Sequence, residues 1–184
     1  MKFILKIIFT ILTVIVLCDL STAQDLSFIQ KKEWRKELRK MEKSDQYYRL
    51  LVIEKPELNN DSIWRLQSVS DSINKLKFVE LTAKYGYPTW ERVRRGGSIV
   101  LILHFTLEKD YHELKGLFRN ELEKGNMPPR EYAWWYDRCQ RNMGLPIYYG
   151  QYTNDKFCGE QLNIYNYHRK EIGLEALQPN PNCE

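Results

Sequence analysis

Polar side chains suited to acid–base chemistry gather early in the chain, where Asp45, Gln46 and Arg49 fall within five residues. The four-residue spacing of Asp45 and Arg49 lets opposite charges meet on one face of a helix. An exposed pair of this kind stabilises a protein by well under about 1 kcal/mol. If the pair faces the interior, the Arg49 guanidinium offers a fork of donors that suits a carboxylate or a phosphate. Both interpretations are open from the sequence.

His104 directly follows five apolar residues, 99–103, in a segment that we expect to be buried. A buried imidazole needs a hydrogen-bond partner, because desolvation without one costs free energy. His104 is therefore a core histidine, a proton donor or acceptor in a cleft, or a metal ligand. Glu108 and His112 follow it at steps of four, but eight residues of continuous helix separate the two imidazoles by about 12 Å. One ion binding nitrogen at about 2 Å cannot hold both, so we predict no metal site and no cofactor.

Further polar candidates lie late in the chain. Asp137 and Arg138 are adjacent, so on a helix they point about 100° apart, one inward and the other to a rim. Tyr149 and Gln151 follow in a segment that looks irregular. We predict His104, Asp45 and Asp137 as catalytic residues. The predicted ligand-binding residues are Arg49, Gln46, Arg138, Tyr149 and Gln151.

Aromatic residues concentrate near these late candidates. Such rings, with hydrogen-bonding tips, suit a sugar or peptide surface and equally suit the core of a small helical domain. The cluster consists of Tyr132, Trp134, Trp135, Tyr136, Tyr148, Tyr149 and Tyr152.

The first 23 residues have the pattern of a secretory signal peptide. Lys2 and Lys6 precede an apolar run over 7–17, and Ser21 and Ala23 are small residues where a signal peptidase reads. The run is shorter than the roughly 20 residues of a spanning helix. We predict cleavage before Gln24, export to the periplasm or the medium, and no stable membrane span afterwards. An uncleaved anchor and a lipoprotein modified at Cys18 are the alternatives.

The composition fits one globular domain over residues 24–184. The chain has 184 residues, a net charge of +4 and 43% hydrophobic residues, which excludes wholesale disorder. The charge is too small to indicate nucleic acid. Three cysteines follow the leader, and we favour a Cys158–Cys183 disulfide because Cys139 lies in a helical pattern. The other pairings are open.

The sequence predicts about six helices in a mainly α domain that carries these residues. Apolar periodicity predicts helices over 26–54 and 61–84, a single turn after Thr89, and a short apolar helix at the centre that Ser98 caps. The second helix should bury one stripe of side chains: Ile63, Leu66, Val69, Ile73 and Leu76. Further helices are predicted over 109–124, 128–143 and 164–172, with an irregular or short hairpin segment over 146–162. Lysines and arginines on the first helix indicate a solvated face, or a patch for an anionic partner.

The order and spacing of the polar motifs resemble a bacterial family that is catalogued only as a domain of unknown function. The resemblance covers residues 34–177 and rests on Asp45-Gln46-x-x-Arg49, Asp71-x-x-Asn74, Tyr85-Gly86-x-Pro88, Gly97-Ser98, His104, Asp137-Arg138, Tyr149-Gly150, Arg169 and Gly173-Leu174. It implies that these polar residues converge on one site. The family pattern has Gln where this chain has Leu103, and Thr-Gln where it has Gln151-Tyr152. An activity that depends on those glutamines would be lost or altered here.

Three functional hypotheses follow from the sequence. The first is an exported domain whose cleft around His104 and Arg49 binds a small polar or anionic ligand, with hydrolytic chemistry. The second is a non-catalytic envelope or extracellular module that binds glycan or protein through the Tyr/Trp cluster. The third is an internal polar network that fixes helix packing.

Overall fold

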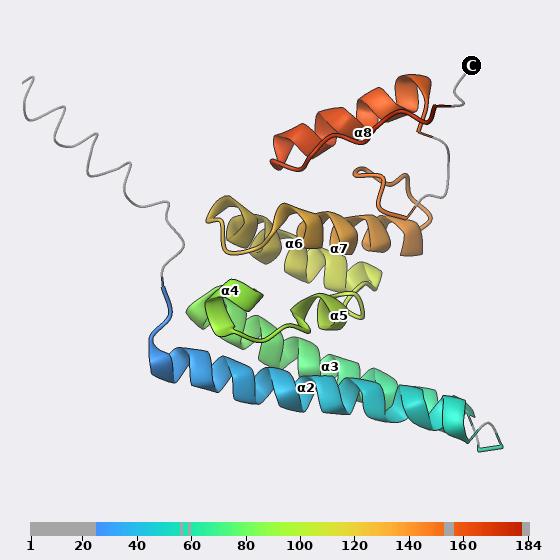
Figure 1. Cartoon of the computed structure of the whole chain (residues 1–184). Helices are drawn as coiled ribbons and strands as arrows, with labels where there is room; N and C mark the ends of the chain where they lie inside the picture. The colour runs from blue at the N-terminus through green and yellow to red at the C-terminus, as the bar shows by residue number, and fades with distance from the viewer. Residues whose placement is uncertain (1–24, 56, 59, 153–156, 182–184) are drawn as a thin grey trace, which may run out of the picture.

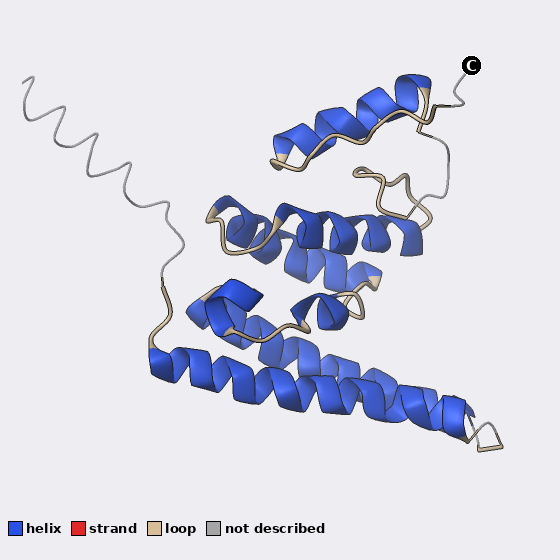
Figure 2. Cartoon of the chain, viewed as in Figure 1, coloured by secondary structure: helices blue, strands red, loops and turns tan. Residues whose placement is uncertain are grey.

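The computed structural model describes residues 25–55, 57–58, 60–152 and 157–181, and this part of the chain is helical without a strand (Figure 2). The mainly α prediction is confirmed. The predicted signal peptide lies outside the described residues. Among those described, no helix is both long and apolar enough to cross a bilayer. The helices are α2 (Phe28–Glu54), α3 (Asn60–Tyr85), α4 (Trp90–Val93), α5 (Ser98–Ile102), α6 (Glu108–Glu123), α7 (Pro129–Asn142) and α8 (Gly159–Glu171).

The two longest helices, α2 and α3, form an antiparallel hairpin at one side of the molecule (Figure 1). The hydroxyl of Ser27 accepts from the Gln30 backbone N–H, and the Gln30 side chain accepts from the Ser27 N–H, so α2 begins with a reciprocal capping box. Trp34, Leu38 and Met41 are buried, as their spacing predicted. α4 and α5 pack over the hairpin, α6 and α7 form the next layer, and α8 lies on the far side.

The predicted buried stripe of α3 is wrong except at its first member. Ile63 is buried, but Leu66, Val69, Ile73 and Leu76 are 50–68% exposed. The face that packs on α2 is instead partly polar: its side chains are Gln67, Ser70 and Asn74 together with Phe78 and Leu81. Hydrogen bonds across the hairpin compensate this burial, since the Ser70 hydroxyl donates to the Ser44 carbonyl and the Asn74 amide donates to the Met41 carbonyl.

The short central helix α5 differs from prediction at both ends. Its N-cap is Gly97, at φ 103°, and Ser98 is the first helical residue rather than the cap. A side chain at position 97 would meet Glu42 at this backbone conformation, so glycine is required. The helix ends at Ile102. His104 therefore lies in the turn that follows α5, and not on a helix continuous with His112.

Aromatic rings fill the core between the hairpin and the α6–α7 layer. Trp135 is fully buried, packs edge-on against Phe118 with ring centroids 4.8 Å apart, and donates its indole N–H to the Phe105 carbonyl. α3 and α6 are also joined by an ion pair of 2.7 Å between Lys75 and Asp110, both buried. The aromatic packing explains why so many rings gather on α7.

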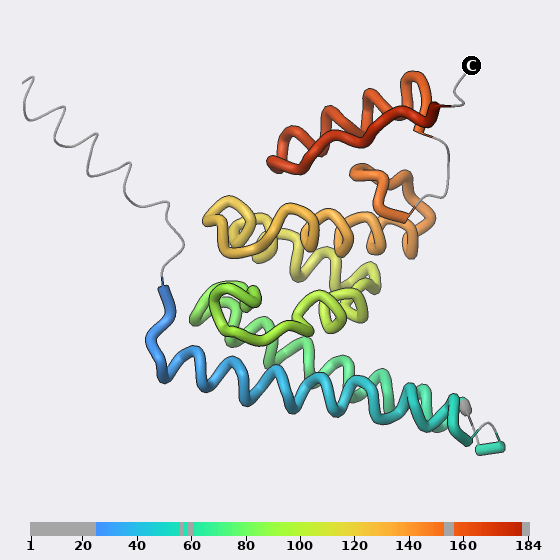
Figure 3. Tube along the Cα trace, in the orientation of Figure 1, coloured from blue at the N-terminus to red at the C-terminus, as the bar shows by residue number. Residues whose placement is uncertain are grey.

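The region after α7 contains no strand within its described residues, so the hairpin alternative for 146–162 is not realised there. α8 begins at Gly159, five residues earlier than predicted. The chain after α8 runs back along that helix (Figure 3), where the Asn166 side chain bonds both backbone groups of Leu177. Arg169 joins α8 to the preceding loop by donating to the Tyr149 carbonyl.

Cys139 is a free, buried thiol, and Cys158 is disulfide-bonded. Its predicted partner Cys183 lies outside the described residues, so the Cys158–Cys183 pairing stays a prediction.

Burial raises the pKa of the Cys139 thiol to about 12, and the thiolate is the species that reacts with alkylating agents. We expect iodoacetamide at pH 8 to leave Cys139 unmodified in the folded protein and to modify it fully in urea. Mass spectrometry of the Cys139 peptide measures both states. Equal labelling rates with and without urea would contradict the buried placement.

Candidate functional site

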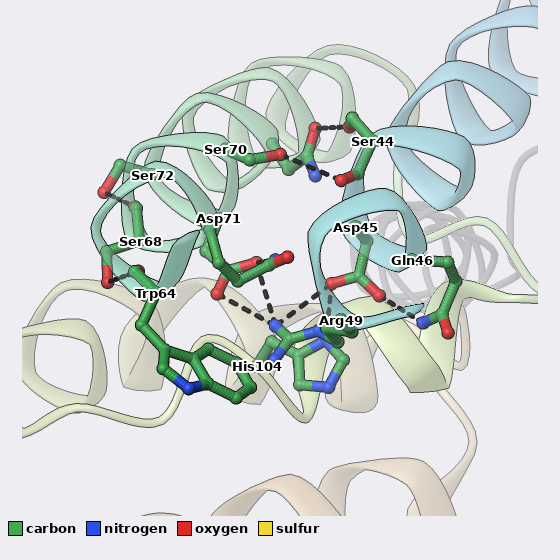
Figure 4. Close-up of polar contacts among 12 residues, drawn as sticks. Ser44, Asp45, Gln46, Arg49, Trp64, Ser68, Ser70, Asp71, Ser72 and His104 are labelled. Atoms are coloured by element: carbon green, nitrogen blue, oxygen red, sulfur yellow. Dashed lines mark hydrogen bonds and ion pairs between the residues drawn. The ribbon is translucent and has the colours of Figure 1, made fainter. Parts of the chain in front are cut away.

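Four charged or ionisable side chains from three elements meet at one side of the α2–α3 hairpin (Figure 4). α2 supplies Asp45 and Arg49, α3 supplies Asp71, and the turn after α5 supplies His104. The side chains of Arg49, Asp71 and His104 are 20–23% exposed, whereas that of Asp45 is only 2% exposed. The group is thus open to solvent on one side and rests on a buried carboxylate.

Asp45 contacts three neighbouring side chains. His104 Nδ1 lies 2.6 Å from Asp45 Oδ1, and Arg49 Nη2 donates to the same oxygen at 3.3 Å. The Gln46 amide donates to the other oxygen at 2.5 Å. Burial alone would raise the pKa of Asp45, but the hydrogen bond with His104 and the electrostatic attraction of the carboxylate to His104 and Arg49 outweigh it. The pKa therefore lies below its ordinary value of 3.8.

Asp71 is the second carboxylate. Arg49 Nη2 lies 3.0 and 2.9 Å from its two oxygens, and the Gln67 amide donates to one of them at 2.6 Å. Burial raises the pKa of Asp71 above its ordinary value despite these bonds. The two carboxyl groups thus shift in opposite directions, a pattern that separates an acid from a base where catalysis uses both.

The Asp45 carboxylate orients the imidazole of His104, whose side chain is 20% exposed. Its Nδ1 faces Asp45, and Figure 4 shows the other ring nitrogen pointing away from both carboxylates. Within the described chain, no hydrogen bond to Nε2 is found. An Nδ1–H that donates to Asp45 leaves the Nε2 lone pair free, which is the arrangement that a general base requires.

Three of these side chains could offer ligand atoms to a metal ion. One ligand atom each from Asp45, Asp71 and His104 lie within 4.8 Å of one another. Arg49 Nη2 already contacts both carboxylates and supplies a positive charge between them, so a cation would have to displace it. The separation of about 12 Å between His104 and His112 holds only for a continuous helix, and the prediction of such a helix is wrong because α5 ends before His104.

The late candidates occupy a different part of the molecule. Asp137 is fully buried, and its carboxylate accepts the backbone N–H groups of Tyr148, Tyr149 and Gln151 at 2.8–3.1 Å. These contacts fix the loop after α7. Gln151 lines a hollow of about 680 Å³ together with Arg130 and Arg169.

Among the described residues, none of these late candidates shares a hydrogen bond or ion pair with the Asp45–His104 group. Arg138 is half-buried on α7. The convergence on one site that the resemblance implies is therefore seen for Asp45, Gln46, Arg49 and His104. For Asp137 and Tyr149 the contacts are with the loop and with α8.

Three of the seven rings of the Tyr/Trp cluster belong to the core, and a fourth, Tyr136, packs against it. Tyr132, Trp135 and Tyr149 are at most 6% exposed, and Trp134 lies beneath the Arg130 guanidinium at 4.7 Å from the ring centroid. Tyr148 is 37% exposed. These rings do not form the flat exposed strip that a glycan- or protein-binding surface would need.

Two members of the site were not proposed as site residues from the sequence: Asp71 and Gln67. Asp71 is four residues after Gln67, a spacing that brings both to one helix face. Asp71 also belongs to the Asp71-x-x-Asn74 motif on which the family resemblance rests. That motif was the available signal, but a single carboxylate in a long helix is usually solvated.

Comparisons with protein-family models, with curated proteins and with solved structures found no match. The class of protein is therefore defined by its fold and its site alone. The described part of the chain is a helical domain in which Asp45, Arg49, Asp71 and His104 form one polar group.

Proposed function

We propose that this protein is an exported domain of the bacterial family it resembles, and that it binds a small polar ligand over His104 and transfers a proton to or from it. His104 Nε2 accepts the proton, Asp45 holds the imidazole in the required tautomer, and Arg49 sets the distance between the carboxylates. The supporting observation is the 2.6 Å contact between His104 Nδ1 and the buried Asp45 carboxylate, with the opposite ring nitrogen free.

The charges of the group favour a neutral ligand over an anion. Two carboxylates and one guanidinium leave one net negative charge while the imidazole is neutral. Because Arg49 Nη2 is shared between Asp45 and Asp71, its attraction for a ligand carboxylate or phosphate is largely cancelled. A hydroxyl group of a sugar, or a water that attacks an ester or amide, suits the free Nε2 better, so hydrolysis is the reaction class that we propose.

A substitution at His104 tests this proposal. His104→Ala removes one hydrogen bond to a carboxylate that keeps two other donors, so we expect a stability loss of about 1–2 kcal/mol. The folded variant should lose any ligand-induced thermal shift that the parent shows with a panel of oligosaccharides, esters and short peptides. His112→Ala is the matched control, because His112 is exposed on α6.

Each outcome of this screen has a defined meaning. If His104→Ala and Arg49→Ala both melt like the parent and respond identically to every compound, the ligand-site proposal is wrong. If both variants fail to fold while His112→Ala folds, the group is an internal network that fixes helix packing.

A further inference from the structure

The outer face of α2 carries a row of basic side chains. Steps of three and four residues place them on the side of the helix opposite Trp34, Leu38 and Met41, and all of them are exposed. The row consists of Lys32, Lys36, Arg39, Lys40 and Lys43.

Two acidic residues of the same stretch of helix are engaged with other elements, and a third pairs with one cation of the row. Glu33 accepts a hydrogen bond from the Tyr85 hydroxyl at 2.7 Å, and Glu42 pairs with Arg95. Glu37 pairs with Lys40 at 2.8 Å. The other four cations of the row have no ion-pair partner within the described chain, so this face presents nearly uncompensated positive charge.

Large apolar side chains continue the row at both ends. Phe28 and Ile29 are 74% and 76% exposed at the start of α2, and Tyr47, Leu50 and Ile53 are 47–74% exposed near its end. From Ile29 to Leu50 the helix advances about 32 Å. One face of α2 thus presents apolar groups, then cations, then apolar groups along the helix, and α2 is a long helix at one side of the molecule (Figure 1).

We propose that this outer face of α2 docks the protein on the surface of a membrane with anionic head groups. Lysine and arginine attract such a surface, while apolar side chains on the same face enter the boundary between head groups and acyl chains. A second copy fits less well, since pairing this face with itself would oppose two rows of like charge. Nucleic acid would attract the cations but would leave the apolar ends without a partner.

A vesicle-binding assay tests the charge component. The exported protein, purified in its processed form, is sedimented with vesicles of phosphatidylglycerol and phosphatidylcholine and with vesicles of phosphatidylcholine alone. We expect binding to the anionic vesicles only, and weaker binding as salt is raised. Lys36→Glu with Lys43→Glu should weaken binding by on the order of 30-fold or more, at about fivefold for each lysine lost near the surface.

Matched variants separate the face from overall charge and overall hydrophobicity. Lys109→Glu with Lys170→Glu makes the same change of net charge on α6 and α8, and should bind like the parent. Leu50→Ser with Ile53→Ser should lower binding at high salt, where the electrostatic part is screened. Leu145→Ser with Ile164→Ser removes exposed apolar groups elsewhere and should have no effect. All four substituted sites of the apolar pairs are 43–74% exposed, so the variants should fold.

Three other outcomes of the vesicle assay would contradict membrane docking by the outer face of α2. Equal loss of binding in both charge-reversal variants would assign the effect to net charge and overturn the proposal. So would equal binding to neutral and anionic vesicles, or no binding to either. If sedimentation velocity instead showed a dimer that Leu50→Ser with Ile53→Ser breaks, the face would be a self-association surface and the proposal would be wrong.

Discussion

Replacing Asp137 with alanine should lower the free energy of unfolding by about 3–5 kcal/mol, the range for removing one partner from a buried charged network. The Asp137 carboxylate is fully buried and accepts the backbone N–H groups of Tyr148, Tyr149 and Gln151. Alanine would leave these donors without an acceptor, and each buried unsatisfied group costs about 1–3 kcal/mol. Urea unfolding followed by tryptophan fluorescence measures the change.

Asp137→Asn is the informative companion variant. The amide keeps the shape of the carboxylate but has only one accepting oxygen. We therefore expect Asp137→Asn to lower the free energy of unfolding by less than Asp137→Ala does. Asp25→Ala, at a side chain that is 98% exposed, should change stability by less than about 0.5 kcal/mol. A loss at Asp137→Ala as small as that at Asp25→Ala would mean that the carboxylate does not hold the loop.

Replacing Asp45 with alanine should lower the free energy of unfolding by about 3 kcal/mol. The change leaves Arg49, Gln46 and His104 without the buried carboxylate that all three contact. The loss is held below that at Asp137 because Arg49 keeps Asp71 as a partner. The same urea titration at pH 7 measures it.

The opposite pKa shifts of Asp45 and Asp71 predict how the free energy of unfolding changes with pH. The pKa of Asp45 is lowered in the folded protein, so its contribution is present above the ordinary value of 3.8 and is lost as the pH falls through the folded pKa. The pKa of Asp71 is raised, so its contribution is present at low pH and is lost as the pH rises. Asp45→Asn should therefore flatten the acid limb of the stability curve, and Asp71→Asn should steepen it. Acid limbs that change alike in the two variants would contradict the assignment.

The helices on which one apolar face meets the core were predictable from sequence. On α2, Trp34, Leu38 and Met41 recur at helical spacing, and the opposite face is charged, so periodicity alone indicates the buried side. On α3 two faces compete. The more apolar one, with Val69 and Ile73, is exposed, because hydrogen bonds from Ser70 and Asn74 to α2 let the polar face pack instead.

The candidate site was predictable only in part, for a similar reason. Asp45 and Arg49 are four residues apart, and His104 follows an apolar run, so each was recognisable by itself. Their meeting depends on the turn after α5, which the apolar run over 99–103 does not predict. Asp71 was missed because its role depends on the angle at which α3 crosses behind Arg49, and local spacing contains no information about that angle.

The residue type of Asp137 does not by itself show whether its carboxylate is structural or catalytic. Asp137 is an acid beside an arginine, in a motif that resembles a family pattern, and this suggested catalysis. Its contacts are backbone N–H groups. A buried carboxylate that organises a loop and one that moves protons have the same residue type and differ only in their partners.

We propose that Asp45 holds the His104 imidazole with its Nε2 unprotonated and reachable from solution. Nitrogen-15 NMR of the side chain, recorded at a pH where the ring is neutral, measures the tautomer directly. We expect a protonated Nδ1 and an unprotonated Nε2 in the parent, with the preference reduced in Asp45→Asn and unchanged in Asp71→Asn. A ring protonated at Nε2 in the parent, or a tautomer indifferent to Asp45→Asn, would contradict it.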